Sequence, residues 1–219
     1  SPRMGATVLS RGTQQSRELS QKNPHPIIIP TPKKVKYSKE IIQIDGIKIE
    51  TNLSHQEKKT VNELLKSFGA DEGSYCLEIK KNSKGNYDYQ LETSARKASL
   101  KARGFKGIIW GLHTFRQILS NQDGLTLPLL KIADSCTLEY RGLMIDLARH
   151  FHGPKQIKKI VEAMASYKMN KLQLGISNDE GWRLQILSIP ELTNIGSLRS
   201  HQQFNRFGNR RDLSTAWGD

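Results

Sequence analysis

Apolar and polar residues alternate with the two-residue period of β-strands in several short stretches near the start of the chain. Residues 41–44 (IIQI) and 47–50 (IKIE) flank Asp45 and Gly46, a dipeptide that tolerates the positive φ angles of a two-residue hairpin turn. This pattern predicts a hairpin. A short edge strand is predicted at residues 27–29 (III), because the prolines around it are tolerated only at the edge of a sheet.

Two stretches have the period of amphipathic helices. Ser54 and Glu57 have the spacing of a capping box, in which each side chain satisfies an amide of the first helical turn, and Gly69 is typical of a helix end. A second helix is predicted over residues 105–119. The apolar positions of the two helices are Val61, Leu64, Leu65 and Phe68, and Ile108, Ile109, Leu112, Phe115 and Leu119.

Two further strands are predicted at residues 75–79 (YCLEI) and 87–91 (YDYQL), on either side of a polar turn. Strands arranged in hairpins with helices between them predict a mainly antiparallel α+β domain. This domain is expected to span residues 26–135, after an irregular tail at residues 1–25.

The pattern changes after this domain. A strand at residues 138–146, a helix at 154–168 and a strand at 171–177 form one predicted βαβ unit with the connection length of a parallel sheet. The predicted buried positions of the helix are Ile157, Ile160, Val161 and Met164. The unit is assigned to residues 136–200, and residues 201–219 form an unassigned tail.

Composition narrows the functional classes. The chain has 219 residues and a formal charge of +13, but its lysines and arginines are scattered, so nucleic-acid binding is not favoured. No run approaches the roughly 18 apolar residues of a membrane span, and no feature assigns a compartment or an oligomeric state. Cys76 and Cys136 lack the neighbouring ligands of a metal site and are interpreted as structural thiols.

Several runs together resemble a known family. Residues 140–151 (YRGLMIDLARHF), 164–172 (MASYKMNKL) and 179–186 (DEGWRLQI) resemble the opening of the catalytic barrel in the family 20 glycoside hydrolases, the β-N-acetylhexosaminidases and chitobiases. Residues 26–35 and 107–119 are similar to the non-catalytic N-terminal α+β domain of that family. The resemblance therefore implies this α+β domain followed by the first βαβ portion of a TIM (β/α)8 barrel, truncated after two strands.

The resemblance implies an enzyme that removes terminal N-acetylhexosamine residues from an amino-sugar glycan or chitooligosaccharide. In this family the acetamido oxygen of the sugar is the nucleophile, an Asp orients it, and the adjacent Glu protonates the leaving oxygen. No metal or organic cofactor is expected.

Three residues carry the expected site. Arg141 matches the arginine that binds the hydroxyls of the terminal sugar, and its planar fork suits two neighbouring oxygens. The alternative for Arg141 is an ion pair with a carboxylate such as Asp146. Asp146 and Asp179 match supporting positions at the barrel rim, and Arg149 and His150 fit the same supporting pattern.

The sequence also departs from the family pattern. Gln173 and Gly175 replace two histidines, and Asn178 replaces the first of two aspartates. Asp179 and Glu180 are adjacent, but they lie outside the His-x-Gly-Gly-Asp-Glu setting of the catalytic pair, so no catalytic residue is assigned. The 219-residue chain is expected to be inactive. The alternative function is that of a degenerate, non-catalytic protein that binds sugars or another partner.

Overall fold

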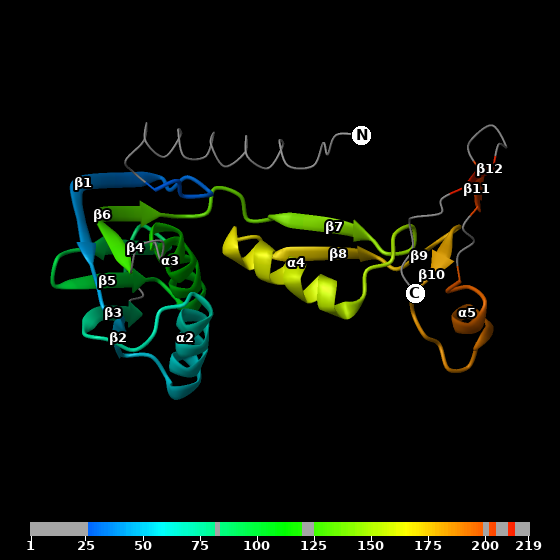
Figure 1. The fold of residues 1–219 in the computed structure, drawn as a ribbon, viewed down its shortest axis with the longest axis horizontal. Helices are drawn as coiled ribbons and strands as arrows, with labels where there is room; N and C mark the ends of the chain where they lie inside the picture. Colours follow the sequence, from blue (N-terminus) through cyan, green and yellow to red (C-terminus); the bar gives the residue numbers. More distant parts are fainter. Residues whose placement is uncertain (1–25, 82–83, 120–124, 199–201, 205–209, 213–219) are drawn as a thin grey trace, which may run out of the picture. The chain divides into compact units, whose positions relative to one another are not determined.

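The computed structural model describes residues 26–81, 84–119 and 125–198, and the backbone of 202–204 and 210–212. The chain divides into two compact units, Ser1–Thr137 and Leu138–Asp219, which are described separately (Figure 1). The predicted tail at 1–25 and most of the one at 201–219 lie outside the described residues. Within the latter, the strands β11 (Gln202–Phe204) and β12 (Arg210–Asp212) pair antiparallel.

The first unit is a six-stranded mixed sheet with two helices, α2 (His55–Ser67) and α3 (Phe105–Ile118). Its strands are β1 (Lys34–Gln43), β2 (Ile47–Thr51), β3 (Tyr75–Lys81), β4 (Tyr89–Thr93), β5 (Lys97–Ala102) and β6 (Thr126–Asp134). They lie in the order β1-β6-β4-β5-β3-β2 (Figure 1). The pairs β2–β3 and β3–β5 are parallel, whereas β5–β4, β4–β6 and β6–β1 are antiparallel.

Side-chain alternation places the core of this unit on one face of the sheet. In β4, Tyr89, Leu91 and Thr93 are buried and the residues between them are exposed. Helix α3 packs on β3, β4 and β5 and buries its apolar side there. Gly111 permits this close approach, because a Cβ at this position would lie 2.3 Å from a methyl carbon of Leu100.

Both predicted helices of this unit are confirmed. Ser54 Oγ accepts a hydrogen bond from the Glu57 amide at 3.4 Å, and the Glu57 carboxylate accepts one from the Ser54 amide at 3.0 Å, so the capping box is present. Val61 and Leu65 are buried, as the apolar period predicts. Gly69 follows the helix with a φ of 72°, the left-handed conformation that favours glycine after a helix end.

The predicted hairpin at Asp45 and Gly46 is wrong. Strands β1 and β2 lie at opposite edges of the sheet, and β2 pairs with β3 instead. An irregularity between Tyr37 and Ile41 interrupts the register of β1, and a bend there carries the chain past the ends of the other strands toward β2 (Figure 1). The Asp45-Gly46 dipeptide correctly indicates a positive φ, which Gly46 has, but it does not determine which strands pair.

Three other details of the sequence pattern also fail. The apolar run at 27–29 forms no strand. The sequence pattern does not predict β5 and β6, because two of the three buried positions of β5 are alanines and Pro128 lies within β6. The parallel crossover from β2 through α2 to β3 makes the sheet mixed, not a series of hairpins.

The second unit contains the predicted parallel βαβ arrangement. Strands β7 (Gly142–Asp146) and β8 (Lys171–Gly175) pair parallel, and α4 (Pro154–Ser166) connects them. The strands are shorter than predicted. Two small strands, β9 (Ser177–Asn178) and β10 (Gly181–Trp182), and the short helix α5 (Glu191–Asn194) follow.

Little apolar surface is buried in this unit. Of the predicted buried positions of α4, Met164 is buried, whereas Val161 remains 45% exposed. In the strand pair, Met144 is 58% exposed and Leu174 is 40% exposed. Two strands and one helix therefore leave apolar side chains of this unit in contact with solvent.

We expect Gly46→Ala to destabilise the first unit. Gly46 has a φ of 149°, and a Cβ there would lie 2.7 Å from the carbonyl oxygen of Asp71, so backbone would have to move. Strain of this kind costs about 1–3 kcal/mol, which lowers the melting temperature by roughly 5–15 °C. Thermal denaturation followed by circular dichroism measures this. Gly85→Ala is the matched control, because a Cβ at Gly85 would meet nothing within 4 Å. Equal melting temperatures for the two variants would contradict the prediction.

Candidate functional site at the carboxyl ends of β7 and β8

Parallel pairing brings the carboxyl ends of β7 and β8 to one edge. Asp146 ends β7 and lies in register with Gly175, which ends β8. The amides of Leu147 and Ala148 both donate to the Gly175 carbonyl, at 2.8 and 3.1 Å, and so fix the turn that leaves β7. Polar side chains that follow the two strands therefore lie close together.

Arg149 is the centre of an ion-pair network at this edge. Its Nη1 lies 2.6 Å from Oδ2 of Asp146, and its Nη2 lies 3.4 Å from Oδ1 of Asp179. Its Nε lies 3.6 Å from Oε1 of Glu180. One guanidinium thus connects the end of β7 with the segment after β8. The structure brings together Asp146 and Asp179, the two supporting residues expected from the sequence.

The network holds Asp146 in its ionised form. The Arg149 backbone amide donates to Asp146 Oδ1 at 3.0 Å, and this bond and the Arg149 guanidinium lower the pKa of the carboxyl group. The side-chain hydrogen bond and the charge of Asp146 raise the pKa of Arg149. An ionised carboxylate only accepts hydrogen bonds, so Asp146 is suited to orienting a neighbouring group and not to donating a proton.

Asn178 extends the network with a donor. Its Nδ2 lies 3.4 and 3.5 Å from the two carboxylate oxygens of Asp146, and its Oδ1 accepts the Glu180 amide at 2.8 Å. An aspartate at this position would instead face Asp146 with a second negative charge. The departure from the family pattern is therefore accommodated by an amide-to-carboxylate contact.

Arg141 lies at the opposite, amino end of β7. Its Nε donates to the Lys168 carbonyl at 2.7 Å, and its Nη1 donates to the carbonyl of Leu138. The Arg141 amide also donates to Asn170 Oδ1 at 2.9 Å. The structure therefore shows Arg141 binding main-chain carbonyls, and it does not place Arg141 in the Arg149 network.

Arg183 is a residue that the sequence reasoning missed. Its Nε and Nη2 donate to the carbonyls of Leu147 and Ala148 at 3.0 and 3.1 Å, and its Nη1 donates to the carbonyl of Ser197. It also lies over the Phe151 ring. Arg183 therefore supports the turn that carries Arg149, and its place in the DEGWR run was the available signal.

The described residues contain neither a cluster of metal-ligating side chains nor a helix that could span a membrane. His150 and His152 place their ring centroids 4.7 Å apart, but no group of three or more metal-ligating side chains occurs in the part of the chain that the structure describes. Within that same part, no helix has the length and apolar character needed to cross a membrane. Cys76 and Cys136 are not joined in a disulfide.

A parallel βαβ unit with charged side chains at the carboxyl ends of its strands is the arrangement used by α/β enzymes. Comparison with known proteins also assigns this chain to a family of enzymes. Residues 25–135 match the model described as glycosyl hydrolase family 20, domain 2, and residues 138–215 match the catalytic domain of the same family. The chain belongs to glycosyl hydrolase family 20.

Individual relatives show the same affiliation. The chain is 38% identical over 111 residues to the N,N'-diacetylchitobiase of Vibrio harveyi, covering 51% of this chain and 13% of that protein. It is 30% identical over 197 residues to a β-hexosaminidase of Porphyromonas gingivalis, covering 79% of this chain and 25% of the relative. The chain therefore spans a quarter or less of the length of these two relatives.

Solved structures extend the likeness to the fold. A GH20 exo-β-N-acetylglucosaminidase from Vibrio harveyi, in complex with N-acetylglucosamine, has a TM-score of 0.67 and 26% identity. The match covers 84% of this chain and 32% of that one. The N-terminal domain and part of the catalytic domain of the family are thus present in this chain.

We expect Arg149→Met to raise the pKa of Asp146 part of the way toward its ordinary value of 3.8, because the backbone amide still donates. Carboxyl carbon shifts in an NMR titration measure this. Stabilisation by ionised Asp146 is complete above that ordinary value and is lost as the pH falls through the lowered pKa. Glu78 is the control, since Lys80 and Lys97 lower its pKa to about 2 without Arg149. An unchanged Asp146 pKa would show that Arg149 does not hold this carboxylate.

Proposed function

We propose that this chain is part of a β-N-acetylhexosaminidase that hydrolyses terminal non-reducing N-acetylhexosamine residues of glycans or chitooligosaccharides. The observation that carries the proposal is the Asp146–Arg149–Asp179 network at the carboxyl ends of a parallel βαβ unit. This network lies within the segment that matches the family's catalytic domain. Both curated relatives named above carry chitobiase or hexosaminidase names.

The second unit is proposed to be the opening of a (β/α)8 barrel. Two of eight strands cannot close such a barrel, and about 250 residues are needed for a complete one. The exposed apolar side chains Met144 and Leu174 support this assignment, because neighbouring strands and helices would cover them. We assign residues 26–135 to the non-catalytic α+β domain and residues 136–200 to strands 1 and 2 of the barrel.

The proposed reaction is substrate-assisted. The acetamido oxygen of the sugar attacks the anomeric carbon, the glycosidic bond breaks, and a glutamic acid protonates the leaving oxygen. Water then opens the oxazolinium ion and restores the original anomeric configuration. The reaction uses no metal or organic cofactor. The Asp-Glu pair that performs these steps in the family has no counterpart in the sequence of this chain, so no residue here is assigned a catalytic role.

Asp146 and Asp179 are proposed as supporting residues of the rim. Arg149 holds both, and Arg183 holds the turn that carries Arg149, so the segments after the two strands keep one arrangement. Arg141 is proposed as the substrate-binding residue on the basis of its family motif alone. Binding a sugar through Nε or Nη1 of Arg141 requires these atoms to exchange main-chain carbonyls for hydroxyls.

A non-catalytic sugar-binding protein is the second candidate. The observation that favours it is the contact of Asn178 with Asp146, which takes the place of a second carboxylate at the rim. Gln173 and Gly175, at the two family histidine positions, point in the same direction.

A chimera separates the two candidates. Residues 26–198 of this chain would replace the homologous segment of the Porphyromonas gingivalis β-hexosaminidase, which supplies the remaining barrel strands. The hydrolase proposal expects the folded chimera to hydrolyse 4-nitrophenyl N-acetyl-β-glucosaminide. A folded chimera that binds N-acetylglucosamine without turnover would favour the second candidate and contradict the first.

The 219-residue chain by itself is expected to show no hexosaminidase activity. It lacks the family's acid, and general-acid assistance alone contributes about 10² to 10⁴ in rate. Release of 4-nitrophenol from the same substrate measures this. Turnover by the purified chain that Glu180→Gln abolishes would contradict the prediction and make Glu180 the acid.

In the chimera, Arg141→Lys is expected to lower kcat/KM by about 10- to 150-fold, because lysine keeps the charge but loses the planar fork that binds two oxygens. The melting temperature of the same variant is measured in parallel. A lower melting temperature with unchanged kcat/KM would assign Arg141 to its main-chain contacts alone.

A further inference from the structure

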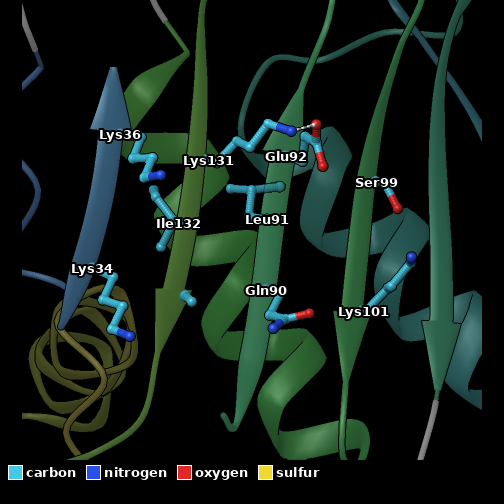
Figure 2. Close-up of a pocket in the computed structure, with 10 residues that line it drawn as sticks. Lys34, Lys36, Gln90, Leu91, Glu92, Ser99, Lys101, Lys131 and Ile132 are labelled. Carbon is cyan, nitrogen blue, oxygen red and sulfur yellow. Dashed lines mark ion pairs between the residues drawn. The ribbon is translucent and has the colours of Figure 1, made fainter. Parts of the chain in front are cut away.

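The face of the six-stranded sheet opposite the helices carries a shallow groove. It has a volume of about 330 Å³ and crosses β1, β6, β4 and β5 (Figure 2). Its charged lining residues are four lysines and one glutamate, Lys34, Lys36, Lys101, Lys131 and Glu92. Figure 2 shows these side chains on the side of the sheet away from the helices. No function considered above uses this surface.

The positive charges of the groove are only partly neutralised. Lys131 Nζ lies 2.5 Å from Glu92 Oε1, which leaves a formal excess of three positive charges. Lys34 lies over the Tyr87 ring, 5.6 Å from its centroid, and this contact retains the charge. Lys36 and Lys101 form no ion pair with any carboxylate that the structure describes. The groove therefore presents ammonium groups to a ligand from solvent.

The strand register brings like charges together. Lys36 lies directly opposite Lys131 in the antiparallel pair β1–β6, and Lys101 is in register with Lys80 in the parallel pair β3–β5. Like charges directly opposite one another across antiparallel strands destabilise a sheet. The sheet tolerates this repulsion on the face opposite α3. An anion bound between the lysines would relieve it.

We propose that this groove of the first unit binds an acidic polysaccharide, a chain of uronic acid and amino sugar units. Lys36 on β1 and Lys101 on β5 are three strand spacings apart, or about 14 Å across the sheet, so one extended chain can meet both through carboxylates of different uronic acid units. Gln90, on β4 between the lysines of β6 and β5, and Ser99, beside Lys101 on β5, offer hydrogen-bonding groups to sugar hydroxyls.

The lining of the groove disfavours single-stranded nucleic acid. Such ligands are bound by aromatic side chains on which the bases stack, and no aromatic residue is among those that line this groove. The choice of a polysaccharide over other extended anions rests on the proposed function of the chain. The inference that an extended anion binds here rests on the charges of the groove and does not depend on that function.

The proposal is tested by titrating the complete chain with a hyaluronan octasaccharide in a calorimeter, at low and at physiological ionic strength. We expect binding that weakens as salt is added, because surface ion pairs are screened. The double variant Lys36→Gln/Lys101→Gln is expected to lose roughly 5- to 30-fold in affinity. Lys36→Arg/Lys101→Arg keeps both charges and is expected to bind within about twofold of the unmodified chain.

The matched control is Lys58→Gln/Lys59→Gln, which removes two exposed lysines from α2 and is expected to leave the affinity unchanged. Circular dichroism confirms that each variant is folded. No binding, equal loss in the control, equal affinity for neutral chitooctaose, or tighter binding of a single-stranded oligonucleotide would each overturn the proposal. The titration measures binding and requires no turnover. An inactive chimera would therefore contradict the proposed hydrolase function without changing the measured affinity of the groove for the polysaccharide.

Discussion

The alternation of side chains across β-strands is the constraint on which both units of this protein depend. Every strand presents two faces, and each face must be covered by apolar packing or hydrated. In the first unit α3 covers one face and lysines occupy much of the other, so a single sheet has a core side and a charged side. In the second unit Met144 remains 58% exposed and Leu174 40% exposed. The first unit therefore buries its apolar side chains more completely than the second.

Parallel pairing has a different consequence for the second unit, because it gathers the carboxyl ends of strands at one edge. There Arg149 connects residues that are more than thirty positions apart, and Arg183 holds the turn on which Arg149 lies. Arg141, at the amino end of β7, binds carbonyls that follow α4 and precede β7. The arginines of this unit thus fix its loops at both ends of the strand pair. Such fixed loops are what a barrel enzyme needs to present substrate-binding groups.

Membership in glycosyl hydrolase family 20 and departure from its pattern occur together in this chain. Both domains of the family match. At Asn178, where the sequence suggests a departure from the family pattern, the amide nitrogen lies 3.4 Å from Oδ1 of Asp146. Asp146 therefore has an amide donor beside it and not a second carboxylate. The open sheet face is independent of this question, since its charges lie on the first unit and its proposed ligand does not require the rim.

The sequence by itself determined the features that depend on neighbouring residues. The capping box of Ser54 and Glu57, the apolar side of α3 and the order of β7, α4 and β8 follow from local spacing, and the runs around them indicated the family. Only the tertiary structure decided which strands pair and which charges meet. It placed β1 and β2 at opposite edges despite the turn signal at Gly46, and it made Arg149 the centre of the rim network. Strand pairs and ion pairs join residues that are far apart in the chain, and the spacing of apolar residues within a short segment does not depend on such contacts.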